Sequence, residues 1–262
     1  MTHVFLEVDG PVGIVTLNNP EKHNAFDNVL ITDLTAALRT LDANENVRVV
    51  ILSAVGKSFS AGADLNWMKR MTTYSEEENL RDAMALGELM RTLHGLSKPT
   101  IARVQGAAYG GGVGLVACCD IAVGTHNAAF SLSEVKLGLI PAVISPYVIA
   151  AIGERAAHRY FLTAERFDAA EGFRLGLLHE LVASDDDMDE KINDICDALM
   201  QGGPLAHFEA KALISAVSTR PIDGAVIADT AKRIARVRAS AEGKEGLSAF
   251  LDKRKSRWIV EN

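Results

Sequence analysis

Two short segments rich in small residues are the places where backbone amides could do chemistry. They read SFSAGADL (58–65) and GAAYGGGVG (106–114), and each follows a predicted strand. Small residues let the backbone approach a ligand closely, and the start of a helix leaves N–H groups without intrahelical partners. Two such amides that converge on one carbonyl oxygen would stabilise negative charge developing there. Tight packing between a strand and a helix is the alternative interpretation of either segment alone.

The spacing of other residues disfavours several common reaction centres. Gly56-Lys57-Ser58 resembles the end of a phosphate-binding loop, but the glycine required five residues earlier is Ile51. The glycine run at 110–114 does not fit the G-x-G-x-x-G pattern, and no G-x-S-x-G motif occurs. The seven His and three Cys lack the spacing of metal ligands, so we expect no metal site. Nucleotide triphosphatases, Rossmann dehydrogenases and serine hydrolases are therefore disfavoured.

The hydrophobic pattern predicts the elements that must position these segments. Short apolar runs at 4–8, 12–17, 47–52, 100–104 and 120–123 alternate with helical patterns at 29–41, 75–96 and 111–118. Asp27 is expected to cap the first of these helices. Strands alternating with helices favour an α/β fold. Only helical patterns follow residue 154, among them 155–162 and a helix over 168–175 that Asp168 is expected to cap. We therefore expect a larger core followed by a helical region, which we place at residues 1–200 and 201–262.

Charge and composition limit the class of partner. The chain has 262 residues, with 27 Lys and Arg against 34 Asp and Glu, which gives a net charge of −7. Sequence-independent nucleic-acid binding requires a basic surface, so the charge disfavours nucleic acid as a partner. Three Cys cannot all pair, which favours a reducing compartment. With no signal-peptide pattern and no apolar run long enough to span a membrane, we expect no membrane association and a cytoplasmic location.

Five segments together resemble the enoyl-CoA hydratase/isomerase (crotonase) superfamily. They are NNPEKHNAF, SAGADL, GAAYGGGVGLVACCDIAV, FSLSEVKLGLIPAV and GLSAFLDKRKSRW, in the expected order along nearly the whole chain. The resemblance implies a ClpP/crotonase-like spiral of β-β-α units with a helical trimerisation region, and a homotrimer or dimer of trimers. AGADLNWM and SEVKLGLIPAVISPYV look most like 3-methylglutaconyl-CoA hydratases of leucine catabolism, or the similar carboxygeranoyl-CoA hydratases.

The same resemblance implies the site residues. The amides of Ala63 and Gly111 would hold the oxygen of an acyl-CoA thioester, and Glu134 would transfer protons. Coenzyme A would enter as part of the substrate, with no prosthetic group. The residues implied to bind it are Lys22, His23, Ala25, Ala61, Asp64 and Leu65, together with Phe250 and Lys253 lent across a subunit boundary.

One position departs from the family pattern. Hydratases of this superfamily typically use two glutamates, and the first falls on Gly114 in this chain. Losing one acid–base partner need not abolish hydration, since such assistance is worth about 10²–10⁴-fold. We therefore favour a hydratase of a branched, 3-methylglutaconyl-like enoyl-CoA. A single-glutamate Δ3,Δ2-enoyl-CoA isomerase and a weakly catalytic acyl-CoA- or RNA-binding protein remain as alternatives.

Further polar side chains are candidates for supporting roles. Tyr109 and Ser145 are possible polar groups near the site, although a structural role is the simpler interpretation of each. A dicarboxylic acyl chain would need a cation at its distal end, for which Lys69, Arg70 and Arg81 are candidates.

Overall fold

The computed structural model describes residues 3–259, and five of the six strands of its larger sheet are those that the apolar runs predict. The sixth strand, β10 (Glu180–Val182), corrects the expectation of helices alone after residue 154, because three residues are too few to show a period. The sheet has the order β1-β2-β3-β5-β7-β10, with β1 antiparallel to β2 and every other pair parallel. Its strands are β1 (Val4–Asp9), β2 (Val12–Leu17), β3 (Val49–Ala54), β5 (Thr100–Val104), β7 (Ile121–Thr125) and β10 (Glu180–Val182). All six residues of β3 are buried, as expected for a parallel strand covered on both faces.

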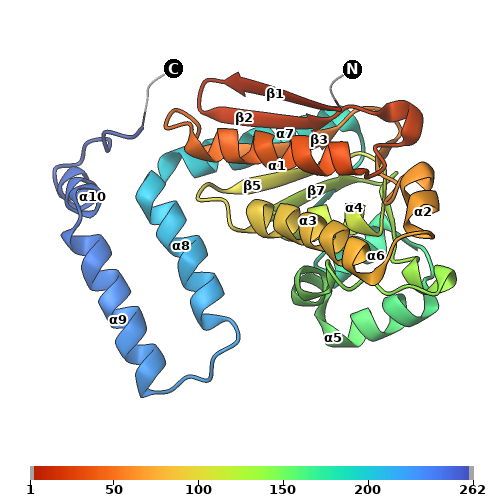
Figure 1. Cartoon of the computed structure of the whole chain (residues 1–262). Helices are drawn as coiled ribbons and strands as arrows, with labels where there is room; N and C mark the ends of the chain where they lie inside the picture. Colours follow the sequence, from red (N-terminus) through yellow and green to blue (C-terminus); the bar gives the residue numbers. More distant parts are fainter. Residues whose placement is uncertain (1–2, 260–262) are drawn as a thin grey trace. The chain divides into compact units, whose positions relative to one another are not determined.

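Helices α1 (Asn28–Ala43) and α3 (Glu76–His94) cover one face of this sheet and pack against each other (Figure 1). The Asp27 side chain accepts a hydrogen bond from Leu30 N, which confirms the predicted cap of α1. Ser75 and Glu78 form a capping box at the start of α3. These local signals define where both helices begin, and their apolar faces then fill the core.

A second, smaller sheet positions the two small-residue segments. Its order is β4-β6-β8-β9, in which β4 (Ser58–Ser60), β6 (Ala107–Tyr109) and β8 (Ala129–Ser131) are parallel and β9 (Phe167–Asp168) is antiparallel. Each of β4, β6 and β8 follows a strand of the larger sheet and leads into a helical segment. These segments are α2 (Leu65–Met71), α4 (Gly111–Cys118) and the 3₁₀ turn η2 (Glu134–Leu137). The chain thus repeats a β-β-α unit with one strand in each sheet, which confirms the expected spiral.

Helix α5 (Ser145–Thr163) begins ten residues earlier than the helical pattern at 155–162 predicts. Pro146 in its first turn suits a helix start, because proline lacks only an N–H that would be unpaired there. Gly153 then breaks the helical backbone with φ +76°, so the pattern matches only the part after the kink. Helix α6 (Ala169–Leu175) follows, capped by Asp168 as predicted.

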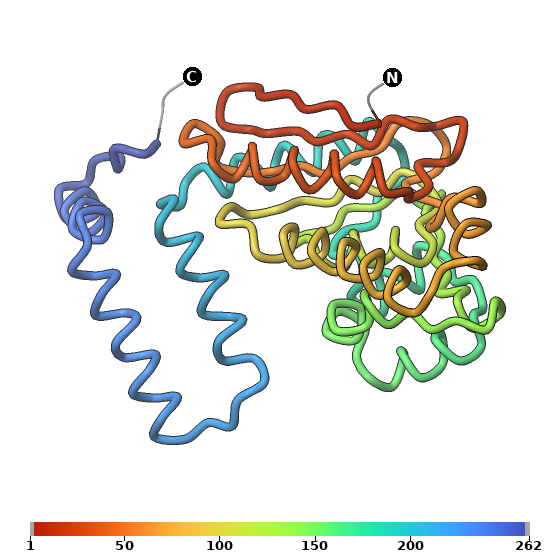
Figure 2. Tube along the Cα trace, in the orientation of Figure 1, coloured from red at the N-terminus to blue at the C-terminus, as the bar shows by residue number. Residues whose placement is uncertain are grey.

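The described residues divide into two units. The first comprises the chain to Leu96 and from Thr100 to Asn193, and the second comprises Ser97–Pro99 and the chain from Asp194. The boundary falls within α7 (Asp185–Gln201). The second unit continues with α8 (Pro204–Val217), α9 (Gly224–Ala239) and α10 (Ala241–Leu251), whose path Figure 2 traces.

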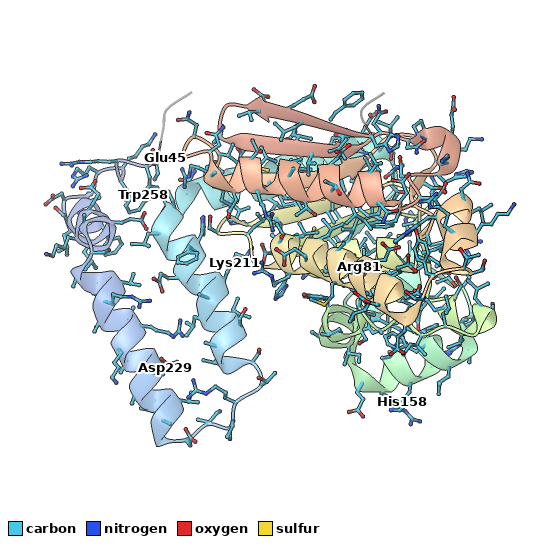
Figure 3. The ribbon with its side chains drawn as sticks, in the orientation of Figure 1. Glu45, Arg81, His158, Lys211, Asp229 and Trp258 are labelled. Carbon is cyan, nitrogen blue, oxygen red and sulfur yellow. The ribbon has the colours of Figure 1, made fainter. Side chains whose placement is uncertain are left out.

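Polar contacts hold the helices of the second unit together. The Glu242 carboxylate accepts hydrogen bonds from the amides of Leu205 (3.0 Å) and Ala206 (2.8 Å), and so caps α8. Asp229, which Figure 3 labels on α9, pairs with Arg233 of the same helix and with Arg220 of the loop before it, each at 3.2 Å. No helix within residues 3–259 is both long enough and apolar enough to cross a membrane.

Candidate active site

A single β-bridge between Phe26 and Ala63 sets the direction in which the Ala63 amide points. Phe26 N donates to Gly62 O at 2.6 Å, and Asp64 N donates to Phe26 O at 2.7 Å. Because Phe26 binds both neighbours of Ala63, the N–H of Ala63 faces the opposite side of the chain. This N–H has no acceptor among the residues that the structure describes.

The amide of Gly111 is available because it opens a helix. Gly110 precedes α4 with φ +49°, and its carbonyl accepts from Val113 N (2.9 Å) and Gly114 N (3.2 Å). Gly111 N is the first amide of the helix and has no intrahelical partner. The two amide-bearing loops touch, since a Cβ on Gly62 would lie 3.0 Å from Tyr109 O. At φ +84°, Gly62 is also in a conformation that only glycine adopts readily.

Both amide-bearing residues line one cavity of about 860 Å³ in the first unit. Most of its wall is apolar and comes from α2, α3 and residues 137–144. The polar side chains in the wall are those of Asn79, Asp82, Tyr109, Ser133 and Glu134. Among the described residues that line it there is no Lys, Arg or His. Ligand sites usually combine such an apolar wall with a few convergent polar groups.

Glu134 is the ionisable group beside the amides. A Cβ on Gly110 would lie 3.0 Å from Glu134 Oε1, so the carboxyl group sits against the turn that precedes α4. Its second oxygen, Oε2, is buried without a hydrogen-bond partner among the described residues. Burial raises the pKa of Glu134 above its ordinary value of 4.5, because the charged form loses hydration.

The space beside Gly114 is filled by apolar side chains. A Cβ at this position would lie 2.3 Å from Ile144 Cγ2 and 3.2 Å from Met90 Cε. Ile144 is 3% exposed and Met90 is fully buried. Position 114 therefore has no room for a glutamate while Ile144 and Met90 stay in place.

Two of the predicted CoA-binding residues hold the loop that carries Ala63. Lys22 Nζ lies 3.0 Å from Asp64 Oδ2, and Asp64 Oδ1 caps α2 by accepting from Asn66 N and Trp67 N. Burial opposes ionisation of Asp64, but the Lys22 hydrogen bond and the two amides outweigh it and lower its pKa. Lys22 and Asp64 thus fix the start of α2, one residue after Ala63.

The other predicted contacts divide between the two units. Ala61 and Leu65 line the cavity, whereas Ala25 is buried and His23 Nδ1 hydrogen-bonds Ser58 Oγ at 3.0 Å. Phe250 and Lys253 belong to the second unit, where both are exposed.

The candidates for supporting roles also differ in position. Tyr109 lines the cavity, while Ser145 donates its hydroxyl to Ala142 O at 2.8 Å. Arg70 donates to Asn28 Oδ1 at 3.2 Å, and Arg81 pairs with Glu77 at 3.1 Å on the surface of α3 (Figure 3). Lys69, Arg70 and Arg81 are absent from the described lining of the cavity.

Sequence reasoning missed Ile144, Met90 and the Trp67–Asp82 contact. Trp67 Nε1 donates to Asp82 Oδ2 at 2.8 Å, which ties α2 to α3 in the cavity wall. Glycine at position 114, inside the predicted helix at 111–118, was the available signal for close packing against α4. Nothing in the local sequence identifies Ile144 as the residue that fills this space.

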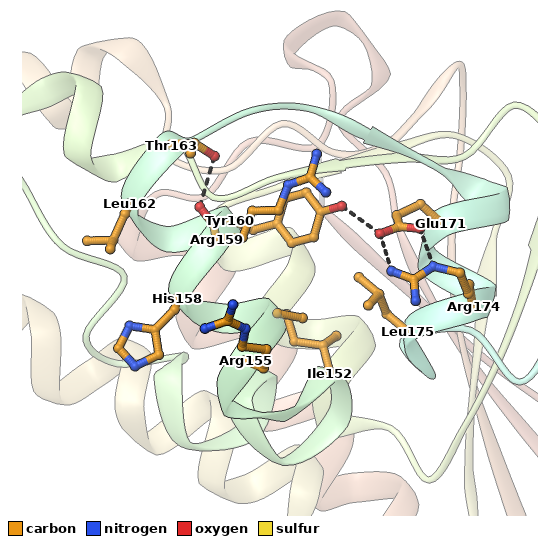
Figure 4. Close-up of a pocket in the computed structure, with 11 residues that line it drawn as sticks. Ile152, Arg155, His158, Arg159, Tyr160, Leu162, Thr163, Glu171, Arg174 and Leu175 are labelled. Atoms are coloured by element: carbon orange, nitrogen blue, oxygen red, sulfur yellow. Dashed lines mark hydrogen bonds and ion pairs between the residues drawn. The ribbon is translucent and has the colours of Figure 1, made fainter.

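A second cavity, of about 670 Å³, lies between α5 and α6 (Figure 4). Its carboxylate, Glu171, accepts from Tyr160 OH at 2.7 Å and from two nitrogens of Arg174 at 2.6 Å. The Arg174 and Tyr160 hydrogen bonds lower the pKa of Glu171 to about 2. Burial and the Glu171 bond raise that of Tyr160 to about 12. This carboxylate is therefore committed to the protein's own donors.

Comparison with known proteins finds relatives that are similar over nearly the whole chain. The model of the enoyl-CoA hydratase/isomerase family matches residues 7–260. A crotonyl-CoA hydratase of Syntrophomonas wolfei is 30% identical, with 98% of each chain covered. A short-chain-enoyl-CoA hydratase of Clostridium acetobutylicum is 30% identical, with 97% of each chain covered. The crystal structure of an enoyl-CoA hydratase from Shewanella pealeana is 46% identical with a TM-score of 0.95, covering 98% of this chain and 96% of its own.

Proposed function

This chain belongs to the enoyl-CoA hydratase/isomerase family, and from that premise we propose that it adds water across the α,β double bond of a branched 2-enoyl-CoA. The observation that carries the proposal is the buried, unpartnered oxygen of Glu134 in the cavity whose wall includes Ala63 and Gly111. Coenzyme A takes part as the thioester portion of the substrate, and no prosthetic group is required.

The two amides polarise the substrate in this proposal. The N–H groups of Ala63 and Gly111 donate to the thioester oxygen, which makes the β-carbon electrophilic. They bind the enolate-like state more tightly than the ground state, because its oxygen carries more negative charge. Removing one donor from such a pair typically costs about 10²–10³-fold in kcat.

Glu134 moves both protons. Its carboxylate takes a proton from water as the water oxygen bonds to the β-carbon, and the electron pair of the double bond becomes the enolate. The resulting carboxylic acid returns a proton to the α-carbon as the enolate collapses, which restores the carboxylate and completes the addition of one water. A pKa raised by burial favours this cycle, because the group must hold the proton between the two steps.

The branched acyl group is supported by the apolar wall and by the likeness of two motifs to 3-methylglutaconyl-CoA hydratases. A distal carboxylate is a separate requirement, because the described lining contains no cation to pair with it. 3-Methylglutaconyl-CoA carries a distal carboxylate that 3-methylcrotonyl-CoA lacks. Comparing kcat/KM for the two substrates determines whether this chain recognises the carboxylate. Loss of the ultraviolet absorbance of the conjugated thioester measures hydration of either substrate.

Isomerisation of a 3-enoyl-CoA to the 2-enoyl-CoA is the second candidate. The apolar side chains beside Gly114 favour isomerisation, because this reaction needs a single acid–base group. Glu134 alone can take a proton from the α-carbon and return it to the γ-carbon. Absorbance of the conjugated thioester then rises instead of falling. Activity with a 3-enoyl-CoA and none with any 2-enoyl-CoA would replace hydration by this reaction.

We also propose that the second unit forms a trimer interface and lends Phe250 and Lys253 to the CoA of a neighbouring subunit. Large apolar side chains on this unit support the assembly: Ile222 is 92% exposed, Phe250 81% and Leu251 76%. Sedimentation velocity combined with assays over a dilution series tests it. A monomer with full activity would contradict the shared site.

A further inference from the structure

Glu134 packs against the turn that precedes α4, and Ile144 packs against a residue within that helix. The Glu134 carboxyl group packs against Gly110, and Ile144 packs against Gly114, four residues further along. Gly110 is the N-cap of α4 and its carbonyl accepts from Gly114 N at 3.2 Å, so one turn of backbone separates the two positions. Both side chains also line the large cavity. A ligand held at the start of α4 therefore meets a carboxyl group first and an apolar side chain about one helical turn further on.

This order matches the order of atoms in the proposed substrate. The Gly111 amide would bind the thioester oxygen, and Glu134 would reach the α- and β-carbons. The carbon substituents on the β-carbon then extend past Glu134 toward Ile144. A second carboxylate and its bound water would make this region polar, whereas Ile144 and Met90 make it apolar.

Ile144 is held firmly in this position. Its carbonyl accepts from Tyr147 N (3.2 Å) and Val148 N (3.0 Å) at the start of α5, and its side chain is 3% exposed. Isoleucine is β-branched, so few χ1 rotamers are available to it. With Met90 close to the same position, the side chain has little room to move away from a ligand.

We infer that Ile144 is the specificity-determining residue of this site, and that it favours enoyl-CoA thioesters whose β-carbon carries an apolar carbon substituent in place of hydrogen. The inference rests on the proposed function. One methyl group in contact with an apolar wall is worth about four- to tenfold in kcat/KM. Shortening the side chain at position 144 removes that contact while leaving Glu134 in place.

The test compares crotonyl-CoA with 3-methylcrotonyl-CoA, which differ by one methyl group on the β-carbon. The measured quantity is the ratio of their kcat/KM values in each variant divided by the same ratio in the unaltered enzyme, so the intrinsic reactivities of the two thioesters cancel. We expect Ile144→Ala to lower the preference for the methylated substrate about four- to tenfold, and Ile144→Val to lower it less. Ile144→Val deletes one methylene, so it serves if the alanine variant does not fold.

Ile152→Ala is the matched control. Ile152 is a buried isoleucine of α5, the helix that begins directly after Ile144, but it lines the cavity between α5 and α6. Its replacement should leave the ratio within twofold of the unaltered enzyme. An active enzyme whose ratio is unchanged in both Ile144 variants would overturn the inference alone. Inactivity of the unaltered enzyme toward every enoyl-CoA would overturn the proposed function and, with it, this inference.

Discussion

Glu134 and Glu171 face two cavities of the same unit, and the structure treats them in opposite ways. Glu171 accepts hydrogen bonds from Tyr160 and Arg174, whereas Glu134 Oε2 is buried without a partner among the described residues. The pKa of Glu171 is lowered to about 2, and that of Glu134 is raised. A compensated carboxylate stabilises the fold. An uncompensated one costs stability and remains available to a ligand, which is typical of functional sites.

Replacing each glutamate by glutamine tests directly whether the two carboxylates differ in role. We expect Glu134→Gln to lower kcat about 10²–10⁴-fold, because the amide cannot accept and return a proton. KM should change little, since the amides of Ala63 and Gly111 are untouched. The free energy of unfolding near pH 7 should be unchanged or higher, because a buried charge is removed. Steady-state kinetics and denaturant unfolding measure the two effects.

Glu171→Gln is the matched control for that variant. It should retain near-normal kcat, because Glu171 lines the other cavity. Equal activity losses in both variants would show that the two carboxylates do not differ in role.

Gly114→Ala tests how closely Ile144 and Met90 pack against α4. Within a helix this change normally stabilises by about 0.5–1 kcal/mol. Here the added methyl group would lie 2.3 Å from Ile144 Cγ2, and overpacking of this kind costs about 1–3 kcal/mol. We therefore expect net destabilisation in denaturant unfolding. Combining it with Ile144→Ala should recover part of the loss, because the two positions compete for the same space.

Gly87→Ala in α3 is the control for the alanine effect itself. Its added Cβ would meet Val143 Cγ1 at 3.8 Å, an ordinary contact. We expect this variant to be as stable as the unaltered protein or slightly more stable. If Gly114→Ala behaved in the same way, the space beside Gly114 would not be closed.

Sequence patterns predicted the long elements and missed the short strands that assemble the site. Strands β1 and β2, the Asp27 cap, β5 and α4 were predicted because each depends on local periodicity or capping chemistry. Strands β4, β6 and β8 have three residues each, too few to show a period. Pairing of β4 with β6 and of β6 with β8, strands far apart in the sequence, brings the loops of the site together.

The individual site residues show the same limit. Ala63, Gly111 and Glu134 were chosen because their segments resemble a known family, and the structure places all three in one cavity wall. The Lys22–Asp64 ion pair and the packing of Ile144 on Gly114 were not predicted. Each joins residues that are 30 or more positions apart, and such contacts depend on the whole fold instead of on local sequence.

A double-mutant cycle on Tyr160 and Glu171 tests whether the hydrogen bond between these two side chains stabilises the fold. Glu171→Gln should destabilise the protein by about 1–3 kcal/mol, because the buried Tyr160 hydroxyl loses a charged acceptor. Tyr160→Phe should cost less, since Arg174 still pairs with the carboxylate. If the hydrogen bond is stabilising, the double variant should be more stable than the sum of the two losses predicts. Strict additivity, measured by denaturant unfolding, would contradict this coupling.

Lowering the pH should affect activity and stability through different carboxylates, because the pKa values of Glu134 and Glu171 are shifted in opposite directions. Glu134 works as a carboxylate, so kcat/KM should fall on the acid side with a midpoint above the ordinary 4.5. Protonation of Glu134 favours the folded state, because its folded pKa is the higher one. Glu171 has a folded pKa of about 2, so its contribution to stability is complete above 4.5 and is lost as the pH falls toward 2. Activity should therefore be lost while the chain is still folded, as circular dichroism and assays over the same pH range would measure. Coincident loss of activity and structure would assign the acid limb to unfolding instead of to Glu134.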